Sequence, residues 1–316
     1  MSSFRERSMV PEPEFESYYG RPILKEPTWK TPDVPLYLFL GGMAGASAVL
    51  AEGAALTGRP GLERVARLTA AAGAGAGTVF LVHDLGRPER FLNMLRVLKP
   101  TSPLSVGSFI LAPFSGLAAA AAGSAVTGWL PRLGRLAGVG AAAFGPPLAT
   151  YTAALFANTA VPTWHEAHRE LPFIFGASGA AAAGGMGLLC APADQHGPAA
   201  RMAVAGAVVE GVGSVLMERR LGMLAEPYRK GLPGKLTMAA RALTVGGAAL
   251  TAVGAVTGTR GALVRRLGGA ALVAGSATLR FAVFEAGRAS ARDPKYTVVP
   301  QRERLAGRSA TGSVPR

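Results

Sequence analysis

The chain has 316 residues, of which 49% are hydrophobic and only 16% are charged, and its formal net charge is +14. Soluble domains carry about a quarter charged residues, so this composition argues against an ordinary soluble domain. The Lys and Arg residues lie mainly in tails and in connectors between apolar runs. That distribution follows the positive-inside rule of membrane proteins and does not indicate nucleic-acid binding.

Residues 1–33 are polar and contain no continuous apolar segment of the secretory-signal type. Prolines punctuate this stretch at Pro11, Pro13, Pro22, Pro27 and Pro32. We expect it to form an extended N-terminal arm, with membrane insertion beginning at the first apolar run.

Eight apolar runs follow the arm, each close to the roughly 20 residues that a membrane-spanning helix needs. They cover residues 34–57, 68–85, 104–127, 134–157, 171–191, 199–217, 237–257 and 262–284. The runs lack the polar face at helical spacing that a soluble helix would show. The sequence therefore predicts an all-α integral membrane protein with eight transmembrane helices in two packed four-helix groups, occupying residues 34–285.

Glycine and proline shape the expected packing of these helices. Glycines recur inside the runs, for example throughout residues 73–77, and small residues allow close helix packing in lipid. Pro146 and Pro147 lie inside the fourth run and are expected to kink it.

Residues 286–316 form a polar C-terminal tail, which we expect to be disordered from Gln301 onward. An even number of spans places both termini on one side of the membrane. Most Lys and Arg fall on that side, so the termini are expected in the cytoplasm, with the protein in the inner or plasma membrane.

Polar side chains at membrane depth are costly and indicate either function or pairing. They are Asp33, Glu52, His83, Asp84, Tyr151, Asn158, Glu210, Arg280 and Glu285. Because successive helices alternate in direction, all except Glu52 are expected in the half nearest the termini. This convergence favours a functional site there. Structural alternatives are that Asp33 caps the first helix and that Glu210 pairs with Arg280.

The sequence offers no ligand set for an electron-transfer centre. A single cysteine, Cys190, cannot hold an iron–sulfur cluster or a tetrahedral zinc. The histidines are His83, His165, His168 and His196, and none forms a mid-membrane pair of haem ligands. The spacing of His165 and His168 is also wrong for a zincin. We therefore expect no haem and no metal in this chain.

Several motifs lie at the ends of the runs. HDLGRPERFLNM occupies residues 83–94 and KPTSPLSVGS occupies residues 99–108. YYGRP stands at 18–22, WKTPDVP at 29–35, and TYT at 150–152 ahead of Asn158. Together these motifs resemble the NrfD/PsrC family, whose members are membrane subunits of polysulfide-reductase-like and related molybdenum or iron–sulfur oxidoreductases.

The resemblance implies a membrane anchor and quinone-reactive subunit, which exchanges electrons between a partner and the quinone pool. The implied partners are a ferredoxin-like iron–sulfur subunit and a molybdopterin catalytic subunit, and the implied substrate is menaquinone or ubiquinone. Asp33 and Tyr151 match family quinone-site positions. In some members a quinone-site histidine aligns near the position of Leu36 in this chain. Because this chain has leucine there, His83 is the candidate to take the role of that histidine. Asn158 completes the expected quinone-binding set.

Physical chemistry assigns roles to these residues, because quinone reduction takes up two electrons and two protons. Tyr151 can donate to a quinone carbonyl, while Asp33 or His83 can exchange protons with water. A proton route through Asp84, Glu52, Glu210 and Arg280 is a further expectation. Four basic residues are expected to contact an acidic partner, namely Arg21, Arg87, Arg90 and Lys99.

Two other functions fit a helical membrane bundle. One is a proton-coupled secondary transporter, which favours broken helices in matched halves and a midplane site. Only the fourth run is broken by prolines here. The other is a passive membrane anchor without quinone chemistry. As an oxidoreductase subunit, the chain would carry a quinone reduction or oxidation site, while the catalytic centre of the complex is expected in another subunit.

Overall fold

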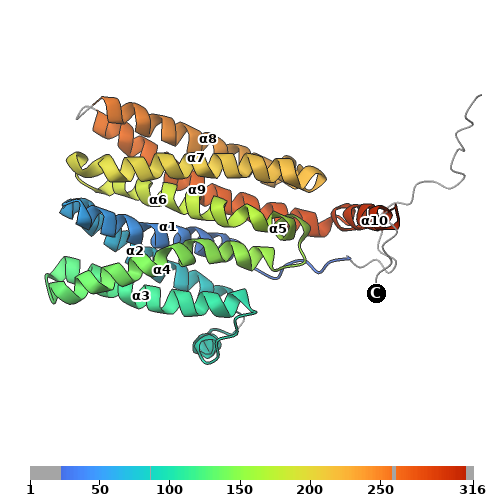
Figure 1. The fold of residues 1–316 in the computed structure, drawn as a ribbon, viewed down its shortest axis with the longest axis horizontal. Helices are drawn as coiled ribbons and strands as arrows, with labels where there is room; N and C mark the ends of the chain where they lie inside the picture. Colours follow the sequence, from blue (N-terminus) through green and yellow to red (C-terminus); the bar gives the residue numbers. More distant parts are fainter. Residues whose placement is uncertain (1–22, 86, 258–260, 311–316) are drawn as a thin grey trace, which may run out of the picture.

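The described part of the protein is helical throughout, apart from its connectors. A computed structural model describes residues 23–85, 87–257 and 261–310, and no strand occurs among them. The long helices lie side by side along one axis (Figure 1). The all-α prediction is confirmed.

Eight long helices correspond to the eight predicted runs. The first four are α1 (Asp33–Leu56), α2 (Pro60–Asp84), α3 (Pro103–Thr127) and α4 (Pro131–Ala157). The others are α6 (Leu171–Cys190), α7 (His196–Leu221), α8 (Gly231–Val256) and α9 (Ala262–Arg292). Shorter elements are η1 (Pro88–Leu95), α5 (Pro162–Glu166), η2 (Ala167–Arg169), η3 (Ala193–Gln195), η4 (Gly222–Tyr228) and α10 (Lys295–Ala310).

Seven helices in the described part are long and apolar enough to cross a membrane. Of the eight long helices, α4 is outside this set because its glycines and its Pro146–Pro147 pair lower its apolar content. The predicted count of eight spans is therefore supported for seven.

The long helices form two groups of four. In the first group, α1 packs on α2 and α4, and α3 packs on α2 and α4. In the second group, α6 packs on α7 and α9, and α8 packs on α7 and α9. The groups meet mainly where α6 lies against α1 and α4 (Figure 1).

Backbone-to-backbone contact at glycines joins the helices around α1. A methyl group added to Gly45 would overlap the carbonyl oxygen of Gly145 in α4, and one added to Gly145 would overlap that of Gly45. A methyl group on Gly179 of α6 would likewise press on the Gly42 backbone. Helices in lipid gain little from hydrophobic burial against one another, so such close packing supplies much of their association.

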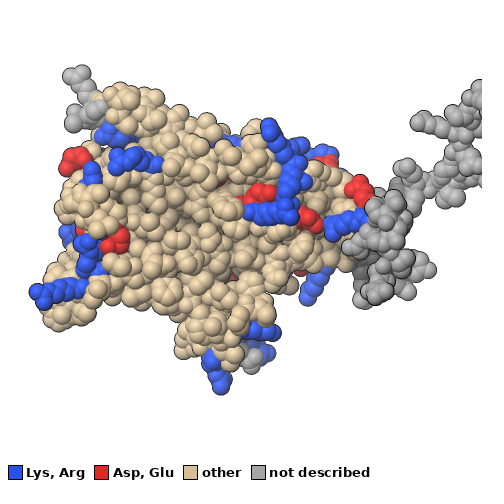
Figure 2. Space-filling view, viewed as in Figure 1, with Lys and Arg blue, Asp and Glu red and all other residues tan. Residues whose placement is uncertain are grey.

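Charged side chains gather toward the two ends of the bundle and around the connector between α2 and α3, leaving an uncharged band between them (Figure 2). One end carries the start of α1 together with α5 and α10, and we call it the terminal end (Figure 1). The other end, which carries the α1–α2 and α3–α4 turns, is the far end. The uncharged band is the part suited to contact lipid.

The predicted disorder after Gln301 is wrong as far as residue 310, because α10 is helical over residues 295–310. Contacts explain the order. Tyr296 is buried in the core, Lys295 Nζ lies 2.8 Å from Glu226 Oε2, and Arg304 Nη2 lies 2.8 Å from Glu166 Oε1.

The glycine contact between α1 and α4 can be tested with a matched pair of substitutions. We expect Gly45→Ala to lower the free energy of unfolding by about 1–3 kcal/mol, because the backbones must separate. Gly53 lies in the same helix and faces open space. Gly53→Ala is therefore expected to leave stability unchanged or raise it by up to about 1 kcal/mol. Thermal unfolding in detergent measures both, and equal melting temperatures would contradict the packing argument.

Candidate functional site

A buried carboxylate and an exposed imidazole meet at the terminal end. Asp33 opens α1, His83 lies near the end of α2, and the distance from Asp33 Oδ2 to His83 Nδ1 is 2.7 Å. The His83 side chain is 72% exposed, whereas that of Asp33 is 6% exposed. The capping interpretation of Asp33 is wrong, since Pro32 holds the cap position without a side-chain hydrogen bond. The pair instead connects a buried acid to water.

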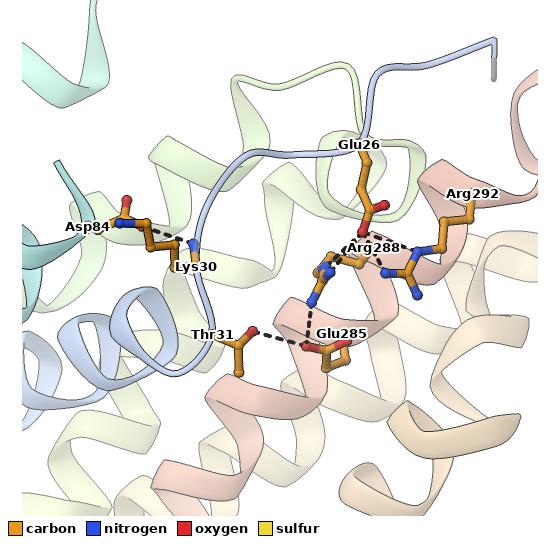
Figure 3. Close-up of polar contacts among 7 residues, drawn as sticks. All are labelled: Glu26, Lys30, Thr31, Asp84, Glu285, Arg288 and Arg292. Atoms are coloured by element: carbon orange, nitrogen blue, oxygen red, sulfur yellow. Dashed lines mark hydrogen bonds and ion pairs between the residues drawn. The ribbon is translucent and has the colours of Figure 1, made fainter. Parts of the chain in front are cut away.

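The arm crosses the terminal end and holds the start of α1 in place (Figure 3). The Lys30 backbone N–H donates to Asp84 Oδ1 at 2.9 Å, which ties the arm to the end of α2. The Thr31 hydroxyl donates to Glu285 Oε1 at 3.3 Å, which ties it to α9. The arm therefore links the two helix groups.

An ion cluster fixes the outer part of the arm to α9 (Figure 3). Arg292 Nη2 lies 2.6 Å and Arg288 Nη2 lies 2.9 Å from Glu26 Oε1. Hydrogen bonding to Arg292 and, less strongly, to Arg288 lowers the pKa of Glu26 from its ordinary value. Glu26 therefore stays ionised to lower pH than a free glutamate, and the cluster stays formed over the same range.

Aromatic stacking fixes the inner part of the arm. Trp29 stacks on Phe156 of α4 and on Trp164 of α5, with ring centroids 5.5 and 5.6 Å apart. The Trp164 indole N–H donates to the Val283 carbonyl of α9 at 2.8 Å. Trp164 can lie this close because Gly287 leaves room for its ring.

A cleft of about 520 Å³ opens beside Tyr151 and Asn158, between α3, α4 and the start of α6. Gly107 of α3 makes room for the Tyr151 ring, since a methyl group there would overlap it. Within the described residues the Tyr151 hydroxyl has no hydrogen-bond partner. The volume is in the range of small-molecule sites. Tyr151 therefore contributes to the lining of the cleft, and its hydroxyl group is available to donate a hydrogen bond.

His168 also lines this cleft, and sequence reasoning missed it. The His165–His168 spacing was interpreted only as a possible metal motif. The sequence signal for the cleft is that His168 follows Asn158 by ten residues, in the connector after α4. His168 Nδ1 lies 3.0 Å from the His165 carbonyl oxygen. A carbonyl accepts only from an N–H, so this contact places a proton on Nδ1 in the neutral ring.

The structure thus divides the four predicted quinone-binding residues into two pairs. Asp33 contacts His83, while Tyr151 and Asn158 line the cleft. Both pairs lie at the terminal end. They border one hydrophobic core, whose members include both Tyr151 and Val34, the residue after Asp33.

The predicted proton-route residues lie in separate sets of contacts. Glu52 pairs with Arg67 at 3.3 Å at the far end, and Asp84 contacts the arm. Glu210 Oε1 accepts from the Thr244 hydroxyl at 3.0 Å.

Arg280 Nη2 donates to the Phe175 carbonyl at 2.8 Å, and its guanidinium lies 3.9 Å from the centre of the Phe175 ring. Among the described residues Glu210 and Arg280 form no ion pair within 4 Å. The two side chains therefore form no direct salt bridge, although each interacts electrostatically with the other.

Two of the four predicted docking residues can be placed. Arg87 and Lys99 are exposed on the connector between α2 and α3, which projects beside α3 (Figure 1). Leu92 and Val97 on the same connector are also exposed. Arg21 and the side chain of Arg90 lie outside the described residues.

Comparison with known families gives a match to a membrane-protein family. The family model described as Polysulphide reductase, NrfD matches residues 25–217, which is more than half of the chain. The match runs from the arm into α7 and includes Asp33, His83 and the cleft residues. No curated protein matches the chain.

Proposed function

Because the chain belongs to the NrfD family, we propose that it is the quinone-reactive membrane subunit of its oxidoreductase complex. Family membership makes it a membrane subunit of such a complex, in which iron–sulfur and catalytic subunits are the partners. The exchange of electrons with menaquinone or ubiquinone is the proposed step. The cleft beside Tyr151 is the observation that carries it.

The cleft suits a quinone head group in shape and chemistry. The unpartnered Tyr151 hydroxyl donates to one quinone carbonyl, and Asn158 and His168 supply further polar groups along the wall. Val106 and Ala154 provide an apolar surface for the ring. A flat ligand with a carbonyl at each edge needs this combination of donors and apolar wall.

The Asp33–His83 pair is the proposed proton exchanger. Each quinone reduced takes up two protons, and these must come from water. His83 is open to water and contacts the buried Asp33 at 2.7 Å. A proton accepted by the imidazole can therefore pass to a carboxylate in the protein interior.

Electrons are proposed to arrive from a ferredoxin-like iron–sulfur subunit that is itself served by a molybdopterin subunit. Since we expect no electron carrier in this chain, we propose that the partner's cluster lies close to the cleft. The exposed Arg87 and Lys99 are near the terminal end, on the connector that leads into the cleft through Pro100. They offer positive charge to an acidic partner there.

We also propose that α4 crosses the membrane as the eighth span. It has 27 residues, and a helix of that length is about 40 Å long. It packs lengthwise on α3 and α1, both of which qualify as spans. With eight crossings, the arm and α10 lie on the same side of the membrane. The distribution of Lys and Arg favours the cytoplasm as that side.

The quinone site is tested by Tyr151→Phe in the purified complex. We expect the quinone-dependent rate to fall roughly tenfold, because the transition state loses one hydrogen bond worth about 1.4 kcal/mol. Reduction of a soluble artificial acceptor by the partner subunits should stay unchanged.

Tyr228→Phe is the matched control, because Tyr228 is a buried tyrosine outside the cleft whose hydroxyl has no partner in the described structure. It should keep the full quinone rate. Full electron flux in Tyr151→Phe would instead identify the chain as a passive anchor.

The docking surface is tested by reversing charge at Arg87 and Lys99. We expect the Arg87→Glu/Lys99→Glu variant to insert normally but to lose the iron–sulfur subunit during purification, because like charges would then face each other. Arg132→Glu/Arg201→Glu changes two exposed residues at the far end and should retain the subunit. Retention by both variants would refute the proposed surface.

A further inference from the structure

A second cavity of about 520 Å³ lies at the far end, away from every residue used so far in the proposed chemistry. It is enclosed by the start of α2, the end of α3 and the start of α4. Its polar lining consists of Arg64, Arg67, Arg135, Glu63 and Ser124.

The charge of this cavity is positive and one of its arginines is buried. Arg67, with a side chain 8% exposed, lies 2.8 Å from Glu63 and 3.3 Å from Glu52. Arg135 approaches Glu52 at 3.7 Å and is otherwise open to the cavity, as is the exposed Arg64. Three arginines thus face two glutamates. The Arg67 Nε is buried without a partner in the described residues.

Two helix starts add to the positive potential. Pro60 and Gly61 at the start of α2 line the cavity, and so does Pro131 at the start of α4. Proline has no backbone N–H, so these starts contribute mainly through the helix macrodipole, which places a partial positive charge there. Helix starts beside arginine side chains favour an anion such as a phosphate group.

The site is built into the packing of α4. Gly138 faces the Glu52–Arg67 pair, and a methyl group at this position would overlap Glu52 Oε1. The glycine therefore admits a buried ion pair where α4 meets α1 and α2. Arg67 is held in place by that pair, which leaves Arg64 and Arg135 as the cations available to a ligand.

The neighbouring surface is that of a membrane boundary. Trp129 and Leu130, in the turn between α3 and α4, are 78% and 61% exposed. Exposed tryptophan beside leucine is typical of the level at which lipid head groups meet the hydrocarbon. The anionic groups at this level of a bilayer are the head groups of its lipids. An anion that enters the cavity from the bilayer is therefore part of a lipid molecule.

We propose that this far-end cavity binds the phosphate of an anionic membrane phospholipid. Arg64 and Arg135 hold the phosphate oxygens, the starts of α2 and α4 contribute their field, and the acyl chains lie along the apolar surface beside Trp129. Arginine side chains hold phosphate groups through charge-assisted hydrogen bonds, which are often bidentate.

The experiment uses the full chain, purified in detergent and stripped of lipid. Binding of phosphatidylglycerol is compared with that of phosphatidylcholine by native mass spectrometry, with inorganic phosphate as a competitor. We expect Arg64→Ala/Arg135→Ala to weaken phosphatidylglycerol binding at least tenfold. This variant spares Arg67, so the buried ion pair that supports folding is retained.

Arg201→Ala/Arg266→Ala is the matched control, because both arginines are exposed at the far end and neither lines the cavity. Its affinity should stay within twofold of the original chain. Equal binding by all three proteins would overturn the proposal. Displacement of the lipid by inorganic phosphate at equal concentration would also overturn it, since the site would then recognise free phosphate. The outcome is independent of Tyr151 and of quinone activity.

Discussion

The close approach of glycine backbones around α1 is the constraint on which the rest of the structure depends. Lipid chains solvate apolar side chains as well as another helix does, so helices associate where their backbones can touch. Gly45 meets Gly145 of α4, and Gly42 meets Gly179 of α6. These contacts place α1 in the first helix group with one side against α6 of the second group. The position of its first residue, Asp33, is fixed as a result.

Lipid also explains why the polar groups lie where they do. A charged group is costly in the middle of a bilayer, and the charged side chains gather toward the two ends of the bundle (Figure 2). At the terminal end, the arm, the Asp33–His83 pair and the Tyr151 cleft share one hydrophobic core. At the far end, arginines and helix starts surround the second cavity. The two ends are therefore chemically distinct, one suited to a carbonyl ligand and the other to an anion.

Sequence reasoning located the helices because length and apolar content are local properties. It missed the first turns of α2, because Glu63, Arg64 and Arg67 interrupt the apolar pattern over residues 60–67. It placed Asp33, His83 and Tyr151 near the terminal end by counting helix directions. It could not predict the contact between Asp33 and His83, nor the position of His168 in the cleft. Both depend on how segments that are distant in the sequence meet in space. Likewise, the order of α10 comes from contacts with distant residues such as Glu166 and Glu226.

Photolabelling of the complex with an azidoquinone shows whether a quinone head group occupies the cleft beside Tyr151. We expect label in the α4 and η2 peptides that carry Tyr151, Asn158 and His168, and we expect excess unmodified quinone to remove it. Label confined to the second helix group, around the small cavity beside Glu210 and Tyr228, would contradict the proposed site.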